Sequence, residues 1–408
     1  MSQNDSPVAE TVLDRLLRTS PGLEIWWDSS PLVYTSWTKK LLASFPESQQ
    51  ADVREQLRRL YDPADPSKTL FTGVTTNPPL SFQAIQDDPA CWSAWVAGYV
   101  QAHPGQDKNQ VGWALYKEIV RQGAELFQPV FEATGYCYGH ISAQVNPYDF
   151  FNSEAMLQQA LELRALGPNI AIKIPGTMQG MPVLRQLTAL GIPTNCTSGY
   201  TVPQFVAVAE NVQEGLLEAR RNCVDLTGWR SVVTYMSARW EAAPEFEQQA
   251  AALGLPLSPE DRRLASTAIF KEAYRIFRER AYPSKMLICS LRLGPVVDGV
   301  TRCWHLEETA GSRAVFTLPP PFLTELFTKA GDLTFEPRIR RGLSPELMER
   351  LLKIPYFATA YDPNGLTPPQ FNELPALLST WAEFKGALDK IVAFAAEAVS
   401  HQPSAVRV

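Results

Sequence analysis

One lysine of this sequence lies in a setting that suits covalent chemistry. Lys173 stands within residues 169–176, in the run Asn-Ile-Ala-Ile-Lys-Ile-Pro-Gly, which is short and apolar enough for a buried strand of a parallel sheet. Burial penalises the ammonium form, lowers the lysine pKa and makes the neutral amine a usable nucleophile toward carbonyl groups. The alternative is a lysine at the end of a strand, where its charge reaches water or a carboxylate.

Polar side chains also stand at the ends of the other predicted strands. In chain order they are Asp28, Asn77, Gln144, Asn146, Asn195, Thr197, Thr234, Arg239, Ser290 and Arg292. Each has a structural alternative, since Asp28 could cap a helix, Asn77 could form a turn before a proline, and the arginines could be surface charges. Together, a lysine, a carboxylate, amides, hydroxyls and two guanidiniums suit Schiff-base chemistry on a polyhydroxylated, phosphorylated ketone.

Eight short apolar or β-branched runs predict the strands that position these residues. They are Leu23–Asp28, Leu70–Asn77, Tyr138–Asn146, Ile170–Pro175, Ile192–Thr197, Ser231–Met236, Met286–Leu291 and Ala314–Leu318. Amphipathic helices are expected between them, at Asp52–Leu60, Gly112–Phe127, Ser153–Leu166, Gly180–Ala189, Val202–Arg221 and Ser266–Arg280. Alternating strands and helices indicate a parallel sheet, and eight such units favour a closed (β/α)8 TIM barrel, whose strands carry functional residues at their carboxyl ends.

Three helical additions to this α/β barrel are expected. One helix precedes the first strand, and residues 241–262, rich in Ala, Pro and Glu, predict a helical insertion after the sixth strand. Beyond Pro321 the chain becomes proline-rich and then helical, with Trp381–Val399 the clearest periodic segment. We therefore expect a barrel over residues 1–320 and a helical extension over 321–408, which could cover the barrel mouth, pack on its flank or form a subunit interface.

Composition narrows the class of protein. The 408 residues are 45% hydrophobic and 20% charged with a net charge of -6, which is typical of a soluble globular protein and disfavours a nucleic-acid partner. The six cysteines form no C-x-x-C pair and the four histidines show no ligand spacing, so we expect no metal and no cofactor. No signal peptide or membrane-spanning run is evident, which predicts a cytoplasmic protein. Either a monomer or a homodimer is compatible with the sequence.

The polar strand ends and their surroundings resemble the transaldolases, the Schiff-base-forming β/α-barrel enzymes of the pentose phosphate pathway. The strongest matches are residues 73–78 (Gly-Val-Thr-Thr-Asn-Pro) and 172–177 (Ile-Lys-Ile-Pro-Gly-Thr), followed by Gly180, 191–192 and 195–197. Weaker matches lie at 27–29, 141–146, 234–239 and 290–292. The resemblance covers residues 20–295 in the expected order, and the length and the C-terminal helices resemble the longer bacterial and plant-type branch.

The resemblance implies a role for each matching residue. Lys173 would form the imine with the C2 carbonyl, Asp28 would act as general base on the C4 hydroxyl, and Thr197 would help position the catalytic water. The substrate-binding positions would be Asn77, Asn195, Thr234, Arg239, Ser290 and Arg292. Among these, the two asparagines would hold hydroxyls of the three-carbon fragment, and the two arginines would clamp the terminal phosphate.

The third predicted strand departs from the family pattern. Transaldolases ordinarily carry a glutamate where this chain has Gln144, and an aspartate where it has Asn146. A glutamine can hold a water but cannot relay its proton, which puts general acid–base assistance of roughly 10²–10⁴ in question. The branch that cleaves fructose 6-phosphate without a sugar acceptor uses glutamine there, but it also places a tyrosine on the sixth strand, where Met236 aligns and Tyr235 is expected on the opposite face.

The resemblance therefore predicts transfer of a dihydroxyacetone unit from a ketose phosphate to an aldose phosphate. Gln144 and Asn146 leave open a transaldolase-like lyase, or an enzyme that builds an unusual sugar. Another alternative is a catalytically weak relative that binds sugar phosphates, although binding alone requires neither Lys173 nor Asp28. The run Ser-Gly-Tyr-Thr at 198–201 is a further departure, because the family usually has apolar residues and serine there.

Overall fold

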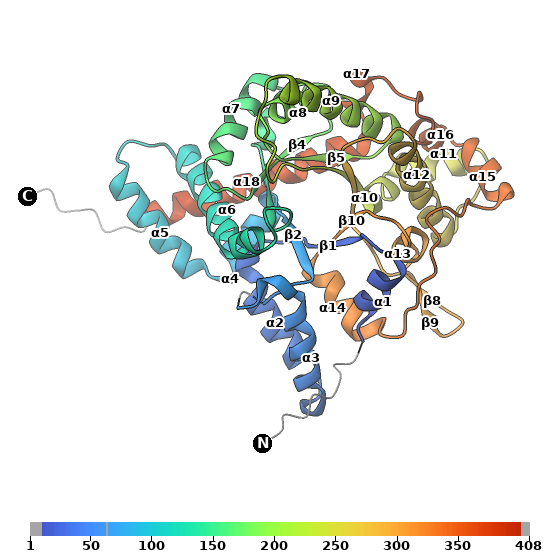
Figure 1. Ribbon diagram of the computed structural model, residues 1–408, viewed down its shortest axis with the longest axis horizontal. Helices are drawn as coiled ribbons and strands as arrows, with labels where there is room; N and C mark the ends of the chain where they lie inside the picture. The colour runs from blue at the N-terminus through green and yellow to red at the C-terminus, as the bar shows by residue number, and fades with distance from the viewer. Residues whose placement is uncertain (1–9, 63, 401–408) are drawn as a thin grey trace, which may run out of the picture.

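Eight parallel strands close into a barrel in this computed structural model, which describes residues 10–62 and 64–400. Around the barrel the strands follow the order β1-β10-β7-β6-β5-β4-β3-β2, and Figure 1 shows the barrel at the centre of the molecule. Their bounds are β1 Glu24–Trp27, β2 Phe71–Thr75, β3 His140–Gln144, β4 Ile170–Pro175, β5 Thr194–Gly199, β6 Ser231–Met236, β7 Lys285–Cys289 and β10 Val315–Leu318. Each predicted strand overlaps one of these, so the predicted (β/α)8 barrel is confirmed.

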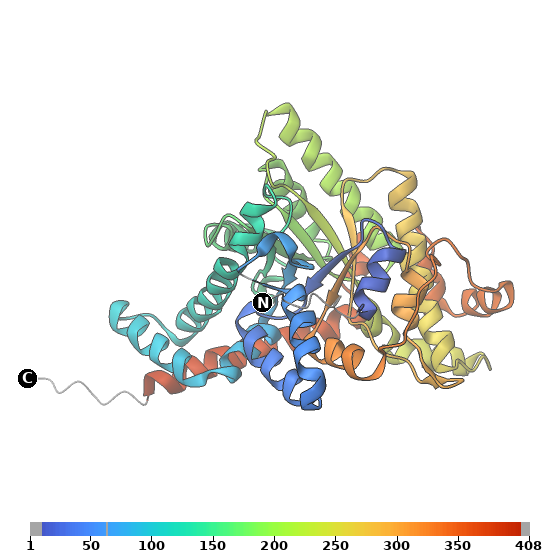
Figure 2. The same ribbon diagram turned by 60° about the horizontal axis from the view of Figure 1, so that its bottom comes forward.

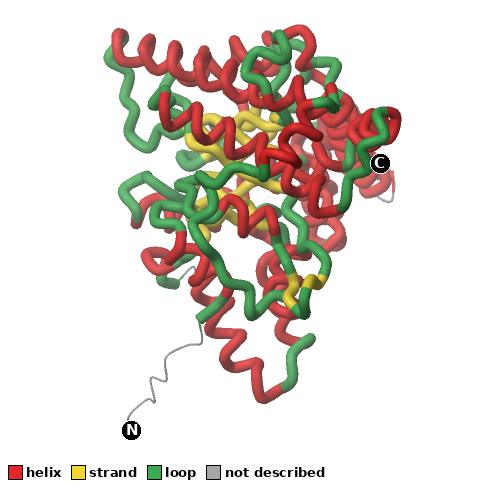
Figure 3. The backbone as a smooth tube through the Cα atoms, turned by 90° about the vertical axis from the view of Figure 1, so that its right-hand side faces the viewer, coloured by secondary structure: helices red, strands yellow, loops and turns green. Residues whose placement is uncertain are grey.

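Helices surround the strands on all sides, as the central yellow strands and red outer helices of Figure 3 show. They are α1 Val12–Thr19, α2 Tyr34–Ala43, α3 Glu47–Leu60, α4 Pro78–Asp87, α5 Pro89–Ala102, α6 Lys108–Ala133, α7 Ser153–Arg164, α8 Gly180–Ala189, α9 Val202–Arg221, α12 Pro259–Glu279, α13 Trp304–Thr309 and α14 Pro320–Lys329. The helix before the first strand is confirmed, and α8 and α9 have the predicted bounds. The hairpin of β8 (Val296–Val297) and β9 (Val300–Thr301) was not predicted.

Residues 241–262 and 321–400 are mostly helical, as predicted. The insertion contains α11 Pro244–Ala252, between α10 Ser237–Glu241 and α12. The extension contains α15 Pro345–Leu352, α16 Pro355–Tyr361, α17 Pro368–Phe371 and α18 Pro375–Ser400. The division at residue 320 stays a prediction, since α14 begins there; residues 401–408 of the predicted extension lie outside the described residues.

Many of the prolines stand at the first position of a helix. Nine of the described helices, α4, α5, α11, α12 and α14 through α18, begin on a proline. The first helical position suits proline, because its fixed φ is already helical and its missing N–H has no partner in the helix. The prolines therefore fix where the helices of the insertion and the extension start.

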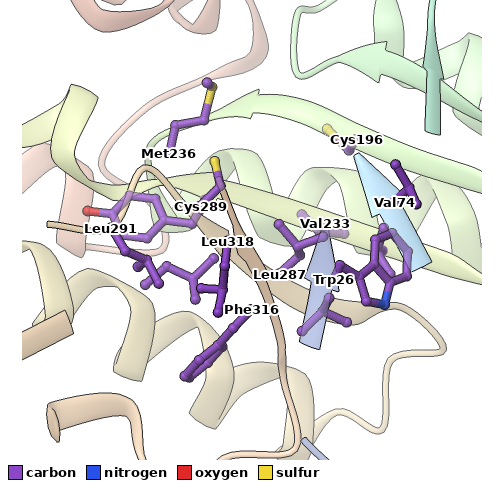
Figure 4. Packing of buried hydrophobic residues seen from close by; sticks show 14 of the residues in the cluster. Trp26, Val74, Cys196, Val233, Met236, Leu287, Cys289, Leu291, Phe316 and Leu318 are labelled. Atoms are coloured by element: carbon purple, nitrogen blue, oxygen red, sulfur yellow. The ribbon is translucent and has the colours of Figure 1, made fainter. Parts of the chain in front are cut away.

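The amino end of the barrel is filled by one aromatic ring and a buried ion cluster. Glu24 accepts hydrogen bonds from Arg230 at 2.9 Å and Lys285 at 2.7 Å, and also from the Trp26 indole at 3.0 Å. The indole leaves no room for a side chain at position 73 of β2, since a Cβ on Gly73 would come within 2.5 Å of it. Figure 4 shows the Trp26 ring beside Val74, the next residue of β2. This end of the barrel is packed, which leaves the carboxyl end for a site.

Helix α18 lies across that carboxyl end and packs against α4, α5 and α6. Figure 2 shows it running along one end of the barrel. In the part of the chain that the structure describes, no helix is both long and apolar enough to cross a membrane. Over the same residues, no group of three or more His, Cys, Asp and Glu side chains is arranged to hold a metal ion.

Candidate active site

Side chains from three neighbouring strands meet at one level inside the barrel. Gln144 of β3 pairs with Lys173 of β4, which pairs with Asn195 of β5. Directly paired residues of a sheet point to the same face, so these three side chains share one side. Asn195 also donates from Nδ2 to Ser142 Oγ at 2.9 Å, a contact that passes over β4. That contact lies within the barrel, since a closed barrel brings strands that are not neighbours together only in its interior.

The Lys173 amine is enclosed. Its side chain is 4% exposed, and Nζ donates a hydrogen bond to the Thr76 carbonyl, just beyond β2, at 3.0 Å. Burial lowers the pKa of Lys173, while the Asp28 carboxylate partly offsets this and the Arg239 guanidinium adds to it. A buried amine with a lowered pKa and one weak partner is suited to attack a carbonyl carbon.

Asp28, directly after β1, is the carboxylate at this level. Thr75 Oγ1 donates to Asp28 Oδ1 at 2.6 Å and lies 2.5 Å from Thr317 Oγ1 of β10. Burial raises the pKa of Asp28, against the lowering effects of Lys173 and of the Thr75 hydrogen bond. A raised carboxyl pKa beside a lowered lysine pKa is the pattern expected of an acid–base pair in an active site.

Hydrogen bonds fix the two asparagines differently. Asn195 is fully buried, and its Oδ1 accepts from Thr234 Oγ1 of β6 at 2.7 Å, so both ends of its amide are held. Asn77 caps α4, because its Oδ1 accepts from the Leu80 N–H at 2.9 Å. The structural alternative for Asn77 is therefore present, and its Nδ2 remains for a further contact.

Beside Lys173, buried polar atoms remain without partners. Neither amide atom of Gln144, which is 0% exposed, nor Oγ1 of Thr197 has a hydrogen-bond partner among the described residues. The Gln144 backbone is fixed, since Tyr116 OH of α6 contacts both its N and its O at 3.0 Å. Buried polar groups rarely stay unpaired in proteins, so these atoms indicate a place where a water or a substrate hydroxyl binds.

The sixth strand ends with a methionine inside the barrel and a tyrosine outside. Tyr235 OH lies 3.0 Å from Ser266 Oγ of α12, so it faces the helices, as predicted. Met236 pairs with Cys289 of β7, and Figure 4 shows these two side chains near each other. The hydroxyl that reaches Met236 is that of Tyr200, at 3.3 Å from Sδ; it also contacts Thr380 Oγ1 of α18 at 2.7 Å.

Arg239 and Arg292 have different surroundings. Arg239, in α10, forms a two-pronged ion pair with Glu383 of α18, with Nη1–Oε2 at 2.5 Å and Nη2–Oε1 at 2.9 Å. Arg292 is exposed beside a cavity of about 400 Å³ that Arg263 also lines, and no carboxylate among the described residues pairs with it. Arg292 is therefore free to bind an anion, whereas Arg239 already binds a carboxylate.

Hydrogen bonds through His305 hold the segment that carries Ser290 and Arg292. Ser290 has a φ of 61°, a left-handed turn directly after β7. The Arg292 N–H donates to His305 Nδ1 at 3.1 Å, and His305 Nε2 lies 2.5 Å from Glu241 Oε1. Since Nδ1 accepts, Nε2 carries the proton and donates to Glu241. Burial lowers the pKa of His305 well below its usual value, and this keeps the ring neutral.

Three residues of the site were missed by the sequence analysis: Tyr200, Thr380 and Glu383. Tyr200 stands in the unusual 198–201 run, which did signal a local change. Thr380 and Glu383 lie more than 140 residues from their partners, and only the helical periodicity around Trp381 marked their segment. A cavity of about 580 Å³ between α12 and residues 339–343 contains none of the residues at the strand ends.

Known proteins match this chain over most of the barrel, from before β2 to the start of α16. The family model described as Transaldolase/Fructose-6-phosphate aldolase matches residues 63–356. Transaldolase 1 of Streptomyces avermitilis is 29% identical over 209 residues, 51% of this chain and 54% of that protein. Transaldolase 2 of the same species is 31% identical over 212 residues, 50% and 54% of the two chains. A transaldolase of Acidothermus cellulolyticus is 30% identical over 212 residues, 51% and 55%.

A closed parallel barrel with a buried lysine beside a carboxylate at its carboxyl end defines a class of β/α-barrel protein equipped for carbonyl chemistry. Within that class, the chain belongs to the transaldolase/fructose-6-phosphate aldolase family. The matched region spans about half the length of the curated relatives.

Proposed function

We propose that this protein transfers a dihydroxyacetone unit from a ketose phosphate to an aldose phosphate through a Schiff base on Lys173. The observation that carries the proposal is the enclosed Lys173 amine, whose pKa is lowered, beside the Asp28 carboxyl, whose pKa is raised. The similarity to relatives that are named transaldolases supports the same function. Location in the cytoplasm and a place in the pentose phosphate pathway are parts of this proposal.

The proposed reaction begins at the lysine. The Lys173 lone pair attacks the C2 carbonyl carbon, and loss of water gives a protonated imine. Asp28 then takes the proton of the C4 hydroxyl while the C3–C4 bond breaks, so that its electrons form an enamine on the lysine and an aldose phosphate departs. Attack of the enamine on the aldehyde of a second aldose phosphate, with the proton returned by Asp28, forms the new bond. Water hydrolyses the final imine.

The other residues bind and orient in this proposal. Asn77 Nδ2 and the held amide of Asn195 contact hydroxyls of the three-carbon fragment, and Thr234 keeps Asn195 in place. The unpaired atoms of Gln144 and Thr197 hold the water that adds to the imine. The phosphate is assigned to Arg239 and Arg292, with Ser290 on the turn between β7 and Arg292.

Gln144 favours a second candidate, an aldolase that cleaves the ketose phosphate without a sugar acceptor. Its amide can hold water but cannot exchange a proton with it at neutral pH. The Tyr200 hydroxyl, next to Met236 at the end of β6, is a nearby group that can donate a hydrogen bond in this region. Burial raises the pKa of Tyr200, so the hydroxyl keeps its proton.

A coupled assay separates the two candidates. Fructose 6-phosphate is supplied with and without erythrose 4-phosphate, and release of glyceraldehyde 3-phosphate is followed. A transferase releases it beyond the first turnover only when the acceptor is present, because the enamine on Lys173 must be consumed before the enzyme can react again. Release at a comparable rate without acceptor would reject transfer in favour of cleavage, and the Lys173→Met variant should release none in either case.

A further inference from the structure

Helix α18 brings its own side chains to the rim of the barrel. Thr380 forms a hydrogen bond with Tyr200, which follows β5, and Glu383 forms an ion pair with Arg239, which follows β6. Trp381 Nε1 donates a hydrogen bond at 2.7 Å to the carbonyl of Pro147, which follows β3. All three partners follow the carboxyl ends of strands, so one helix reaches across this part of the mouth (Figures 1 and 2).

Arg239 is the guanidinium whose charge acts on the catalytic pair. It lies in α10, directly after the carboxyl end of β6, and its charge influences the pKa of Lys173 and of Asp28. Its side chain is 29% exposed and lies over the Phe384 ring at 5.9 Å. An anion that approaches Lys173 from solvent would therefore meet Arg239, if its guanidinium were free.

The guanidinium is not free, because the Glu383 carboxylate occupies its Nη1–Nη2 edge, which is one of the edges that can bind an oxyanion. Two parallel N–H···O contacts join the pair, which is the fork geometry that guanidinium also forms with phosphate. Glu383 is ionised, since its hydrogen bonds to Arg239 lower its pKa. Arg292, by contrast, has no carboxylate partner among the residues described.

We propose that Glu383 is a specificity-determining residue that competes with the substrate's phosphate for Arg239. A phosphorylated substrate must displace the Glu383 carboxylate before Arg239 can hold the phosphate through its Nη1–Nη2 edge. The residue therefore sets how tightly the site binds phosphorylated rather than uncharged sugars. This inference rests on the proposed function for the place of Arg239 in the site, and it adds the group that opposes phosphate binding there.

The helix does not depend on this ion pair for its position. Leu377, Phe384 and Ile391 of α18 are fully buried, and Thr380 holds Tyr200. The Glu383 side chain is 48% exposed, so an amide can replace its carboxylate without a buried charge or a cavity. A Glu383→Gln variant should keep its fold and lose only the competing charge.

The test compares Glu383→Gln with the wild-type chain and with a control, Asp389→Asn. The control removes the same charge from α18, at a residue that accepts a hydrogen bond from Tyr148 and does not contact Arg239. Calorimetry measures the affinity for inorganic phosphate, and steady-state kinetics measures fructose 6-phosphate and unphosphorylated fructose. We expect Glu383→Gln to bind phosphate on the order of tenfold more tightly. KM for fructose 6-phosphate should fall by a similar factor, with little change in kcat or in the KM for fructose.

A double substitution shows whether the gain acts through Arg239. In an Arg239→Met background, Glu383→Gln should give no tighter phosphate binding, because the competing pair is already broken. Unchanged phosphate affinity in Glu383→Gln, or an equal gain in Asp389→Asn, would overturn the inference. Tighter phosphate binding without dihydroxyacetone transfer would reject the proposed function alone, while transfer with unchanged phosphate affinity would reject the competition alone.

Discussion

The reactivity of Lys173 depends on its enclosure and on two nearby charges. Burial lowers the pKa of the amine, the Asp28 carboxylate raises it, and the Arg239 guanidinium lowers it. Only the neutral amine attacks a carbonyl, so imine formation should rise with pH until Lys173 is deprotonated. In the proposed reaction the carboxylate therefore has two opposed effects, since it would serve as a base and it also keeps the lysine charged to higher pH.

Asp28→Asn should separate those two effects. Removing the carboxylate lowers the Lys173 pKa further, so the rising limb of imine formation moves to lower pH. Trapping with cyanoborohydride and dihydroxyacetone measures this step, because dihydroxyacetone has no C4 hydroxyl that needs a base. Cleavage of fructose 6-phosphate should fall by about 10²–10⁴. If the rising limb of the pH profile stays in place or moves to higher pH, Asp28 does not act on the Lys173 pKa as described. The control is Asp298→Asn, which removes a carboxylate from the exposed turn between β8 and β9.

Gln144→Glu tests the unpaired amide. A carboxyl group at this place can exchange protons with a bound water, so single-turnover formation and hydrolysis of the imine should become at least tenfold faster. Rapid-quench trapping provides the measurement. The matched control is Gln110→Glu, at the start of α6, where glutamate preserves the capping box. An unchanged rate in Gln144→Glu would show that another group already relays the proton.

At the scale of elements, Asn77 serves a helix and the site at once. Its Oδ1 caps α4 while its Nδ2 is assigned to the substrate. The loop between β2 and α4 is thereby anchored by the same side chain that contacts substrate in the proposed reaction. Stability and activity can be separated here, because serine also caps helices but lacks an amide N–H.

We predict that Asn77→Ala lowers the free energy of unfolding by about 1 kcal/mol, since the cap is lost. Asn77→Ser should unfold within a few tenths of a kcal/mol of wild type, about the spread among good capping residues. Both variants should lose kcat/KM for fructose 6-phosphate to a similar extent. Urea denaturation and steady-state kinetics provide the two measurements. Wild-type activity in Asn77→Ser would restrict the residue to its structural role.

The elements were predictable where periodicity is local. Each strand or helix has its own residue pattern within a short stretch of sequence, so the strands and the bounds of α8 and α9 follow from the sequence. Helix α12 begins at Pro259 and not at the predicted Ser266, because its first turn carries a proline and charged residues and has no apolar periodicity of its own. The short strands β8 and β9 have only two residues each and carry no periodic signal.

At the scale of the whole molecule, opposite ends of the barrel have different tasks. The amino end is filled by Glu24, Trp26, Arg230 and Lys285, whereas α18 crosses the carboxyl end. The buried lysine and the polar strand ends were predictable, because each belongs to a strand with its own pattern. The pairing of Glu383 with Arg239 was not, since it depends on how a distant helix packs onto the finished barrel.

The ion cluster at the amino end predicts sensitivity to acid. Nearby Arg230 and Lys285 outweigh the effect of burial and lower the pKa of Glu24 from 4.5 to about 2. Its contribution to stability is therefore complete above pH 4.5 and is lost as the pH falls toward 2. Glu24→Gln should cost about 3 kcal/mol at pH 7. Urea denaturation should show this difference shrinking below pH 4.5; a difference independent of pH would contradict the ionic role.

The Schiff base on Lys173 is tested most directly by reduction with borohydride in the presence of fructose 6-phosphate, followed by peptide mass spectrometry. Lys271 and Lys285 serve as internal controls, because both also have pKa values lowered by burial but are paired with Glu308 and Glu24. We predict a reduced dihydroxyacetone unit on Lys173 and none on the two control lysines. An unmodified Lys173, or an adduct on a different lysine, would contradict the proposed mechanism.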